Sequence, residues 1–532
     1  MPNDKHHPYH PIIYVRGFAA TQSEIEDTVA DPYMGFNVGS TKSRLLWTGK
    51  VKKFFFESPI VRLKRNHDYD DVYLDGDDLV LNAQAQGKVP YKCVVIYRYY
   101  DDASEDFGSG TTPPIENFAK GLSELIIKLK QKICSNSDND VKPEEFRVYL
   151  VAHSMGGLVC RAFLQNPALG SDEARSAVDK FFTYATPHNG IDMRVIRNVP
   201  GWASFGDVNN FNRGKMAGYL GLPAGVEDVS SVVNFPPERI FNLVGTNPAD
   251  YLVMSGLSSW AVGERSDGLV RIDNATTHGL DPMGKDIQSP RAFVYRSHSG
   301  YYGIVNSEEG YQNLTRFLFG TMRIDGILDI DDVSFPEDVQ KEFDPPNSKA
   351  VRASYQIEIV VCLRGSQWQM HRRTSRENSP IFREYEKLFP RIAGGARVSD
   401  REQSPRLFSV FLDKNKSVAS NKSVSFALDL NVLVPDYEIA GLPFLAKHYE
   451  GGYIYRDLII IEASEDPNST AGWKIKYGYQ DQTPNVASLD AKTSELPDKS
   501  GITFDIDVIQ QSRPGIKAKL RIEARPWNEK PR

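Results

Sequence analysis

One serine in this chain has the neighbours that a nucleophile needs. Residues 148–163 read VYLVAHSMGGLVCRAF, an apolar run that breaks at Ser154 and then resumes with helical spacing. Small residues stand two positions to either side, at Ala152 and Gly156. A strand, a tight turn and a helix with this spacing are typical of a nucleophile elbow. The pattern predicts that Ser154 stands exposed above a helix N-terminus, where free N–H groups favour a developing anion.

A serine hydroxyl needs a base, which is normally a histidine that a carboxylate orients. With an elbow of this type the order along the chain is serine, acid, histidine. Three histidines follow Ser154 in the first part of the chain: His188, His278 and His298. His278 is expected in a loop that no strand delivers, and His188 follows the strand after the elbow. We prefer His298 as the base, because it directly follows the last predicted strand on a small-residue turn.

The acid should lie between the serine and this histidine. Asp267 meets that order, and Gly268 beside it permits a tight turn that aims the carboxylate at the imidazole. Asp250, which follows the preceding strand directly, is the alternative. Aspartates in turns usually only cap backbone N–H groups. The order and the neighbouring glycine favour Asp267.

A tetrahedral intermediate needs two convergent N–H donors. One should be the backbone N–H of Met155, the residue after the nucleophile. The other should come from the loop after an early strand. The first strand ends at residues 16–20, so the N–H of Phe18 is the candidate, with Gly17 allowing close backbone approach.

Alternating strand-like and helix-like segments over residues 1–335 would position these groups. Short apolar strands are predicted at residues 12–15, 94–97, 148–152, 181–185, 240–245 and 292–295, and helices at about 113–134 and 307–319. The alternation predicts an α/β domain with a mostly parallel sheet. Loops at the carboxyl edge of that sheet can then reach the elbow.

Two long connections, at about residues 20–90 and 191–237, interrupt the pattern. Long connections in compact domains are often lids or binding loops. We expect cap insertions here, and simple packing on the sheet is the alternative. Apolar residues that could cover a pocket are Trp202, Phe205, Phe211, Met216, Tyr219 and Leu220, with a further group before Asp267 at Leu252, Val253, Met254, Leu257 and Trp260.

The pattern changes across residues 320–350, an acidic segment that contains prolines. We predict a domain boundary within it and a linker at residues 336–350. Beyond it, apolar and polar residues alternate. Strands are expected at residues 355–363, 407–412, 424–434, 453–461, 473–479, 502–508 and 516–523. Such a series predicts an all-β, sandwich-like domain over residues 351–532. Structural support is its default role; binding to membrane, polysaccharide or a protein partner is the alternative.

Bulk properties exclude several classes of protein. A chain of 532 residues is too long for one ordinary core, and its 40% hydrophobic content is that of a soluble globular protein. The net charge of -6 provides no basic face for nucleic acid. We interpret the basic runs at residues 50–53 and 62–65 as solvated surface.

The sequence also gives expectations about the location of the protein and about its cofactors. Four cysteines without paired spacing suggest a reducing compartment, and residues 1–10 lack the apolar core of a secretory signal. No apolar run is long enough to span a bilayer. We therefore expect a cytoplasmic protein, with signal-independent export as the alternative. The acidic run at residues 68–78 does not have the spacing of a calcium loop, and no zinc, phosphate or dinucleotide motif is present, so no metal or cofactor is expected.

Taken together, these segments resemble the lipase and esterase branch of the α/β-hydrolases. The resemblance is carried by residues 12–18, 152–156, 186–190 and 266–270 and by His298. It is nearest to bacterial triacylglycerol lipases and the related GPI-inositol-deacylase-like lipases. It implies an α/β-hydrolase fold in which Ser154 is the nucleophile, Asp267 the acid and His298 the base. Ala152 stands where the first glycine is usual, and Arg16 where a histidine is usual before the oxyanion-loop glycine.

The expected activity is that of a serine carboxylic-ester hydrolase (a lipase, esterase or phospholipase) that acts on apolar acyl esters through an acyl-enzyme on Ser154. A lipid ester is the expected partner, with peripheral membrane contact as a further expectation. An acyltransferase with the same three residues is the nearest alternative, because an alcohol can replace water as the acyl acceptor. A catalytically silent hydrolase fold that serves as a binding or scaffold protein is the alternative from another class.

Overall fold

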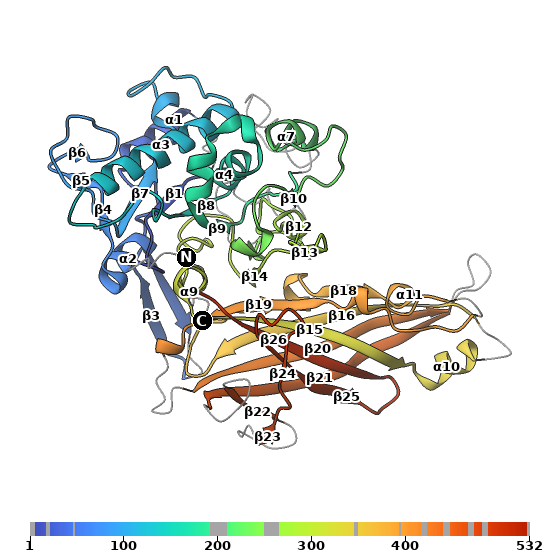
Figure 1. The fold of residues 1–532 in the computed structure, drawn as a ribbon. Coiled ribbons are helices and arrows are strands. Elements are labelled where there is room, and N and C mark those ends of the chain that lie inside the picture. The colour runs from blue at the N-terminus through green and yellow to red at the C-terminus, as the bar shows by residue number, and fades with distance from the viewer. Residues whose placement is uncertain are drawn as a thin grey trace. The chain divides into compact units, whose positions relative to one another are not determined.

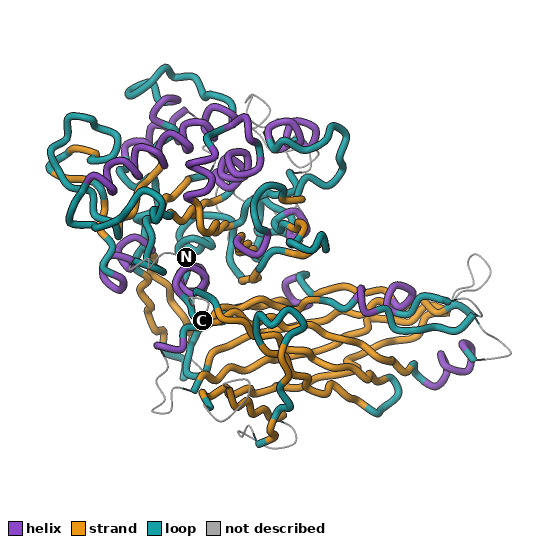
Figure 2. The backbone as a smooth tube through the Cα atoms, viewed as in Figure 1, coloured by secondary structure: helices purple, strands orange, loops and turns teal. Residues whose placement is uncertain are grey.

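The computed structural model describes residues 6–17, 22–45, 48–191, 210–248, 265–344, 349–392, 395–416, 423–439, 447–466, 473–480 and 488–528. The chain divides into two compact units (Figures 1 and 2). The N-terminal unit comprises Met1–Arg291 and Tyr295–Phe319, and the C-terminal unit comprises Ala292–Val294 and Gly320–Arg532.

A seven-stranded sheet organises the N-terminal unit. Its order is β14 (Arg291–Val294), β11 (Ile240–Gly245), β9 (Val178–Tyr184), β8 (Val148–His153), β1 (Ile12–Val15), β7 (Cys93–Tyr97) and β4 (Asp70–Asp71). The strands from β11 to β4 pair in parallel. β1 lies between β7 and β8, with Val15 opposite both Tyr97 and Ala152. The loops that follow β1 and β8 therefore emerge side by side.

Three long helices cover this sheet. α3 (Ile115–Ser135) and α4 (Met155–Gln165) pack on one another, and α4 also packs on β8 and β1. α9 (Glu308–Phe319) packs on β9 and β11, from the other face in Figure 1. α3 buries Phe118, Leu122, Leu125, Ile126 and Leu129, the helical repeat that the sequence shows. β8 and α4 are buried almost throughout, which is expected of a central parallel strand and the helix behind it.

The first long connection holds more regular structure than a simple cap. It contains α1 (Gln22–Ala30), the hairpin β2 (Ser40–Leu45) and β3 (Val51–Phe56), α2 (Pro59–His67), the edge strand β4, and the short pair β5 (Tyr73–Leu74) and β6 (Asp77–Asp78). α5 (Asp172–Ala177) precedes β9. α7 (Arg213–Tyr219) lies in the second connection, and β10 (Ser231–Val232), β12 (His278–Leu280) and β13 (Asp286–Gln288) form a small sheet.

The C-terminal unit is a sandwich of two antiparallel sheets. One has the order β19 (Arg406–Leu412), β15 (Met322–Ser334), β26 (Gly515–Pro526), β25 (Ile502–Gln510) and β24 (Ser494–Glu495). The other has the order β17 (His371–Arg373), β16 (Val351–Leu363), β20 (Val424–Ile439), β21 (Lys447–Glu465), β22 (Trp473–Tyr479) and β23 (Leu489–Asp490), with β18 (Ile381–Glu384) also on β16. Side chains from both sheets, such as Leu328, Leu430 and Leu520, share one buried core. The predicted fold class is confirmed in both parts.

The boundary between the units lies earlier than predicted. The division falls at Gly320, whereas the sequence suggested a catalytic domain to residue 335 and a linker at 336–350. β15 pairs with β26 and β19 and so belongs to the sandwich, and α10 (Glu337–Phe343) occupies part of the expected linker. The acidic residues of β15 were misleading, because arginines neutralise them. Asp325 pairs with Arg323 at 2.8 Å, and Asp329 with Arg521 at 2.8 Å.

Candidate active site

Ser154 occupies a strained turn between β8 and α4. Its φ of 53° and ψ of -127° lie in a region that residues with a side chain rarely adopt. Such a conformation costs roughly 1–3 kcal/mol and persists only where the surroundings impose it. Here the Ser154 N–H donates to the Tyr184 carbonyl at 2.9 Å, and the Gly157 N–H donates to the Ser154 carbonyl at 3.0 Å. The strand–turn–helix expected of an elbow is present.

Glycine at position 156 is required by the backbone of β1. A Cβ atom there would lie 2.3 Å from the Arg16 carbonyl oxygen and 2.4 Å from that of Val15. Gly17 is under the same constraint, since its Cβ would lie 2.6 Å from the Ser154 Cβ. The two glycines let the loop after β1 touch the elbow.

We expect Gly156→Ala to destabilise the N-terminal unit by about 2–4 kcal/mol, because the added methyl group meets backbone that cannot move aside. Gly218→Ala is the matched control: this exposed glycine of α7 has no atom within 4 Å of its would-be Cβ. There alanine should stabilise the helix by about 0.5–1 kcal/mol. Thermal unfolding of the two variants measures both effects, and equal midpoints would contradict this account of the elbow.

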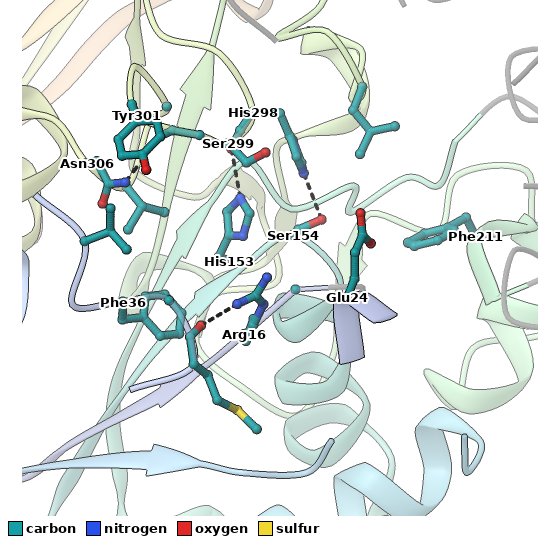
Figure 3. Close-up of a pocket in the computed structure, with 18 residues that line it drawn as sticks. Arg16, Glu24, Phe36, His153, Ser154, Phe211, His298, Ser299, Tyr301 and Asn306 are labelled. Carbon is teal, nitrogen blue, oxygen red and sulfur yellow. Dashed lines mark hydrogen bonds between the residues drawn. The ribbon is translucent and has the colours of Figure 1, made fainter. Parts of the chain in front are cut away.

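The structure brings Ser154, Asp267 and His298 together. The His298 Nε2 lies 2.9 Å from the Ser154 Oγ, and its Nδ1 lies 2.9 Å from the Asp267 Oδ2 (Figure 3 shows the serine contact). All three side chains are buried to within a few per cent. His298 follows β14, and Asp267 lies on the segment between β11 and β14. A hydroxyl, an imidazole and a carboxylate in this linear arrangement can pass a proton from serine to histidine.

Backbone bonds fix the Asp267 carboxylate. Its Oδ1 accepts the N–H groups of Leu269 at 3.0 Å and Val270 at 2.8 Å, which leaves Oδ2 for the imidazole. The His298 N–H also donates to the Asp267 carbonyl at 2.9 Å. Gly268 has a φ of +102°, so the turn needs a glycine there, as the sequence suggested. Two hydrogen bonds therefore connect Asp267 and His298, one between their side chains and one between their backbone groups.

The other candidates have different surroundings. His188 is fully buried, its ring 3.2 Å from the Thr183 hydroxyl, and its carbonyl accepts from Arg161 at 2.8 Å. His278 is the first residue of β12, not part of a loop as expected, and lies 2.8 Å from Asp286. Neither ring is bonded to Ser154. Asp250 and Phe18 lie outside the described residues.

His153 is a site residue that the sequence analysis passed over. Its Nε2 lies 2.9 Å from the His298 carbonyl oxygen, and the two rings are 4.9 Å apart. Desolvation and the neighbouring His298 lower the pKa of His153 to about 3. It is therefore neutral at physiological pH, so it donates its Nε2–H and adds no charge beside an imidazolium. In the sequence, only its position directly before Ser154 indicated that it belongs to the site.

Two further residues form hydrogen bonds to the backbone of segments beside the elbow. The Tyr99 hydroxyl donates to the Arg16 carbonyl at 2.7 Å, which holds the loop that leads to Phe18. The buried Arg161 of α4 donates to the carbonyls of His188, Val229 and Ser231 at 2.8–3.0 Å. In the sequence its signal was a single arginine within the apolar helical repeat of residues 155–165. These bonds fix the segments beside the elbow.

A cavity of about 380 Å³ opens on Ser154 (Figure 3). Its lining is mainly apolar, from Met34, Phe36, Val38, Phe211, Leu269 and Val305. Arg16 and Glu24 add one charge of each sign. This size and character fit a small organic ligand or part of an acyl chain.

Only part of the predicted lid can be compared with the structure. Phe211 reaches the cavity, whereas Met216, Tyr219 and Leu220 are buried around α7 and act as packing. Trp202, Phe205, Leu252, Val253, Met254, Leu257 and Trp260 lie outside the described residues.

Met155 is the first residue of α4. Its N–H is one of the helix-terminal donors that have no carbonyl acceptor within the helix. It is thus available as a donor to an oxyanion. Within the described ranges no group of three or more histidine, cysteine or carboxylate side chains has the geometry to hold a metal ion. No helix in that part of the chain is both long and apolar enough to cross a membrane.

Residues 111–217 match the family model of the PGAP1-like alpha/beta domain. This segment contains α3, β8, the elbow, α4 and β9. The match confirms the resemblance to a PGAP1-like α/β domain over this segment. The mostly parallel sheet with helices on both faces agrees with the expected α/β-hydrolase fold. Comparison with curated proteins gives no match.

Several solved structures are similar to the chain. The mature lipase BlEst2 of Bacillus licheniformis is 15% identical over 59% of this chain and 91% of its own, with a TM-score of 0.28. Phospholipase PlaB from Legionella pneumophila is 12% identical over 79% of this chain and 86% of its own, with a TM-score of 0.28. Its complex with thio-NAD gives 11% identity, 83% and 89% coverage, and a TM-score of 0.30. Scores this low carry no argument about activity, so the functional assignment depends on the site itself.

Proposed function

We propose that this chain is a serine carboxylic-ester hydrolase that cleaves apolar acyl esters through an acyl-enzyme on Ser154. The observation that carries the proposal is the bonded series Asp267, His298 and Ser154 at the base of a cavity, with 2.9 Å at both links. Each member performs a chemically different task, and a purely structural role would not require all three.

In the first half of the reaction the Ser154 Oγ attacks the ester carbonyl carbon while its proton passes to the His298 Nε2. The carbonyl oxygen becomes an oxyanion, which the Met155 N–H and, in this proposal, the Phe18 N–H stabilise. Removing one such donor typically costs 10²–10³-fold in kcat. The tetrahedral intermediate then expels the alcohol, which takes the proton from His298.

In the second half a water molecule completes the cycle. His298 removes a proton from that water, and the hydroxide adds to the acyl carbon. The collapse of this second intermediate returns the proton to Ser154 and releases the carboxylic acid. Throughout, Asp267 remains ionised, holds the imidazole with its Nδ1–H toward Oδ2, and stabilises the imidazolium.

The apolar lining of the cavity favours an acyl chain over a small polar acid. A series of p-nitrophenyl esters from acetate to palmitate tests this choice. We expect measurable hydrolysis at octanoate and longer chains, because each buried methylene contributes about 0.8 kcal/mol. The best rate at acetate with none at octanoate would refute an apolar acyl substrate. Addition of a competing alcohol identifies the acceptor, since ester products in place of free acid would reveal acyl transfer.

A further inference from the structure

The hairpin of β2 and β3 presents an unusual outer face. Side chains alternate along a strand, so Val51, Lys53 and Phe55 share one face of β3. Val51 is 64% exposed and Phe55 is 77% exposed, and Lys53 is exposed between them. The opposite face is partly covered, since the Arg62 guanidinium of α2 lies 5.3 Å from the Phe56 ring. The outer face therefore places two large apolar groups in solvent.

This face is continuous with the opening of the catalytic cavity. Phe55 and Phe56 line a groove of about 490 Å³ together with Tyr301 and Tyr302. Tyr301 also lines the cavity of Ser154 and lies three residues after His298 (Figure 3). Tyr301 is 63% exposed and Tyr302 is 41% exposed. We call Val51, Lys53, Phe55, Tyr301 and Tyr302 the hairpin patch.

The charge around the hairpin patch is positive. Lys50, Lys52 and Lys53 are all exposed, and within the described ranges none of the three pairs with a carboxylate. Glu57, the acidic residue that lines the groove, lies 2.5 Å from Arg65 and is neutralised. Apolar and aromatic side chains that alternate with lysines suit the interface of a bilayer with anionic headgroups. There the rings lie at headgroup depth and the ammonium groups meet the phosphates.

We propose that the hairpin patch rests on an anionic lipid bilayer and brings the cavity mouth to the lipid surface. The apolar surface from Phe55 to Tyr301 then leads an acyl ester from the bilayer towards Ser154 without full exposure to water. Delivery of an acyl ester to Ser154 rests on the proposed ester hydrolysis. Binding of the hairpin patch to the bilayer does not depend on it.

Vesicle sedimentation of the full chain tests the contact. Vesicles of phosphatidylcholine are compared with vesicles that also contain phosphatidylglycerol. We expect binding to the anionic vesicles, which weakens as salt screens the lysines. Phe55→Ser should weaken that binding about tenfold or more. Lys53→Gln should reduce the preference for anionic vesicles severalfold.

A second hairpin turn supplies matched controls. Met283, which is 82% exposed, and Lys285 lie between β12 and β13, on the opposite side of the N-terminal unit from β3 in Figure 1. Met283→Ser and Lys285→Gln should leave vesicle binding unchanged. Thermal unfolding of every variant checks that the fold is intact.

Two results would overturn the proposal: no binding of the full chain to anionic vesicles, or equal binding by the Phe55→Ser and Met283→Ser proteins. If the hairpin patch binds a protein partner and not a bilayer, the full chain will not bind to the anionic vesicles. Loss of ester hydrolysis alone would leave the vesicle result standing, so the two proposals fail separately.

Discussion

Replacement of Ser154 by alanine is expected to lower the kcat for ester hydrolysis by about 10⁴–10⁶-fold. The hydroxyl lies 2.9 Å from the His298 Nε2 at the base of the cavity, so the acyl-enzyme cannot form without it. The remaining donors still bind and polarise the ester, which is why some catalysis over water persists. The binding of substrate should change little, because the apolar lining is untouched.

A fluorophosphonate probe separates this mechanism from nonspecific hydrolysis. The native protein should be labelled at one site, and Ser154→Ala should not be labelled. Ser299 lines the same cavity, so Ser299→Ala controls for the loss of any hydroxyl there (Figure 3). Equal labelling of the native and Ser154→Ala proteins would show that another residue is the nucleophile.

Local pattern was sufficient to predict the elbow and the positions along the chain of most strands of the parallel sheet. Residues 148–163 combine an apolar strand, small residues at two fixed positions and a helical repeat, and each of these has a direct steric or packing cause. The choice of His298 and Asp267 followed because parallel strands bring their carboxyl ends to one edge. The structure places the two side chains within hydrogen-bond distance of each other, as that reasoning requires.

Features that depend on residues far away in the sequence could not be predicted from the local pattern. β15 was missed because its acidic residues are neutralised by arginines that lie up to about 200 residues away in sequence, such as Arg521 for Asp329. The role of His153 depends on the His298 carbonyl, and that of Tyr99 on the Arg16 carbonyl. A local pattern carries no information about such bonds.

The interpretation of residues 50–53 as solvated surface agrees with their exposure, but it left out the strand that contains residues 51–53. Residues 50–53 were interpreted as solvated surface because three lysines dominate them. The structure places Val51 and Lys53 in a strand with Phe55, so the period of two, and not the charge count, determines what that face presents. A short run can satisfy several patterns, and only the observed pairing with β2 selects one.

We expect Asp267→Asn to lower kcat about 10³–10⁴-fold while KM changes little. The amide oxygen can still accept the N–H groups of Leu269 and Val270, which bond to Oδ1 at 3.0 and 2.8 Å. The amide nitrogen must then face the His298 Nδ1 and donate to it. That bond favours the tautomer with its proton on Nε2, which points a donor at the Ser154 hydroxyl. The imidazole then has no lone pair with which to remove the serine proton.

The chain offers a second aspartate–histidine pair as the control. Asp286 lies 2.8 Å from the Nδ1 of His278 on the small sheet of β12 and β13, and its carboxylate is exposed. Asp286→Asn makes the same chemical change to an aspartate that no part of the mechanism uses, so kcat should stay within about twofold of the native value, since exposed pairs contribute little. Steady-state kinetics with a soluble ester compare the two variants. If Asp267→Asn kept native kcat, orientation of the imidazole by this carboxylate would not be needed, and Asp267 would have to be given up as the acid. If both variants lost activity alike, the effect would be one of folding and not of the tautomer.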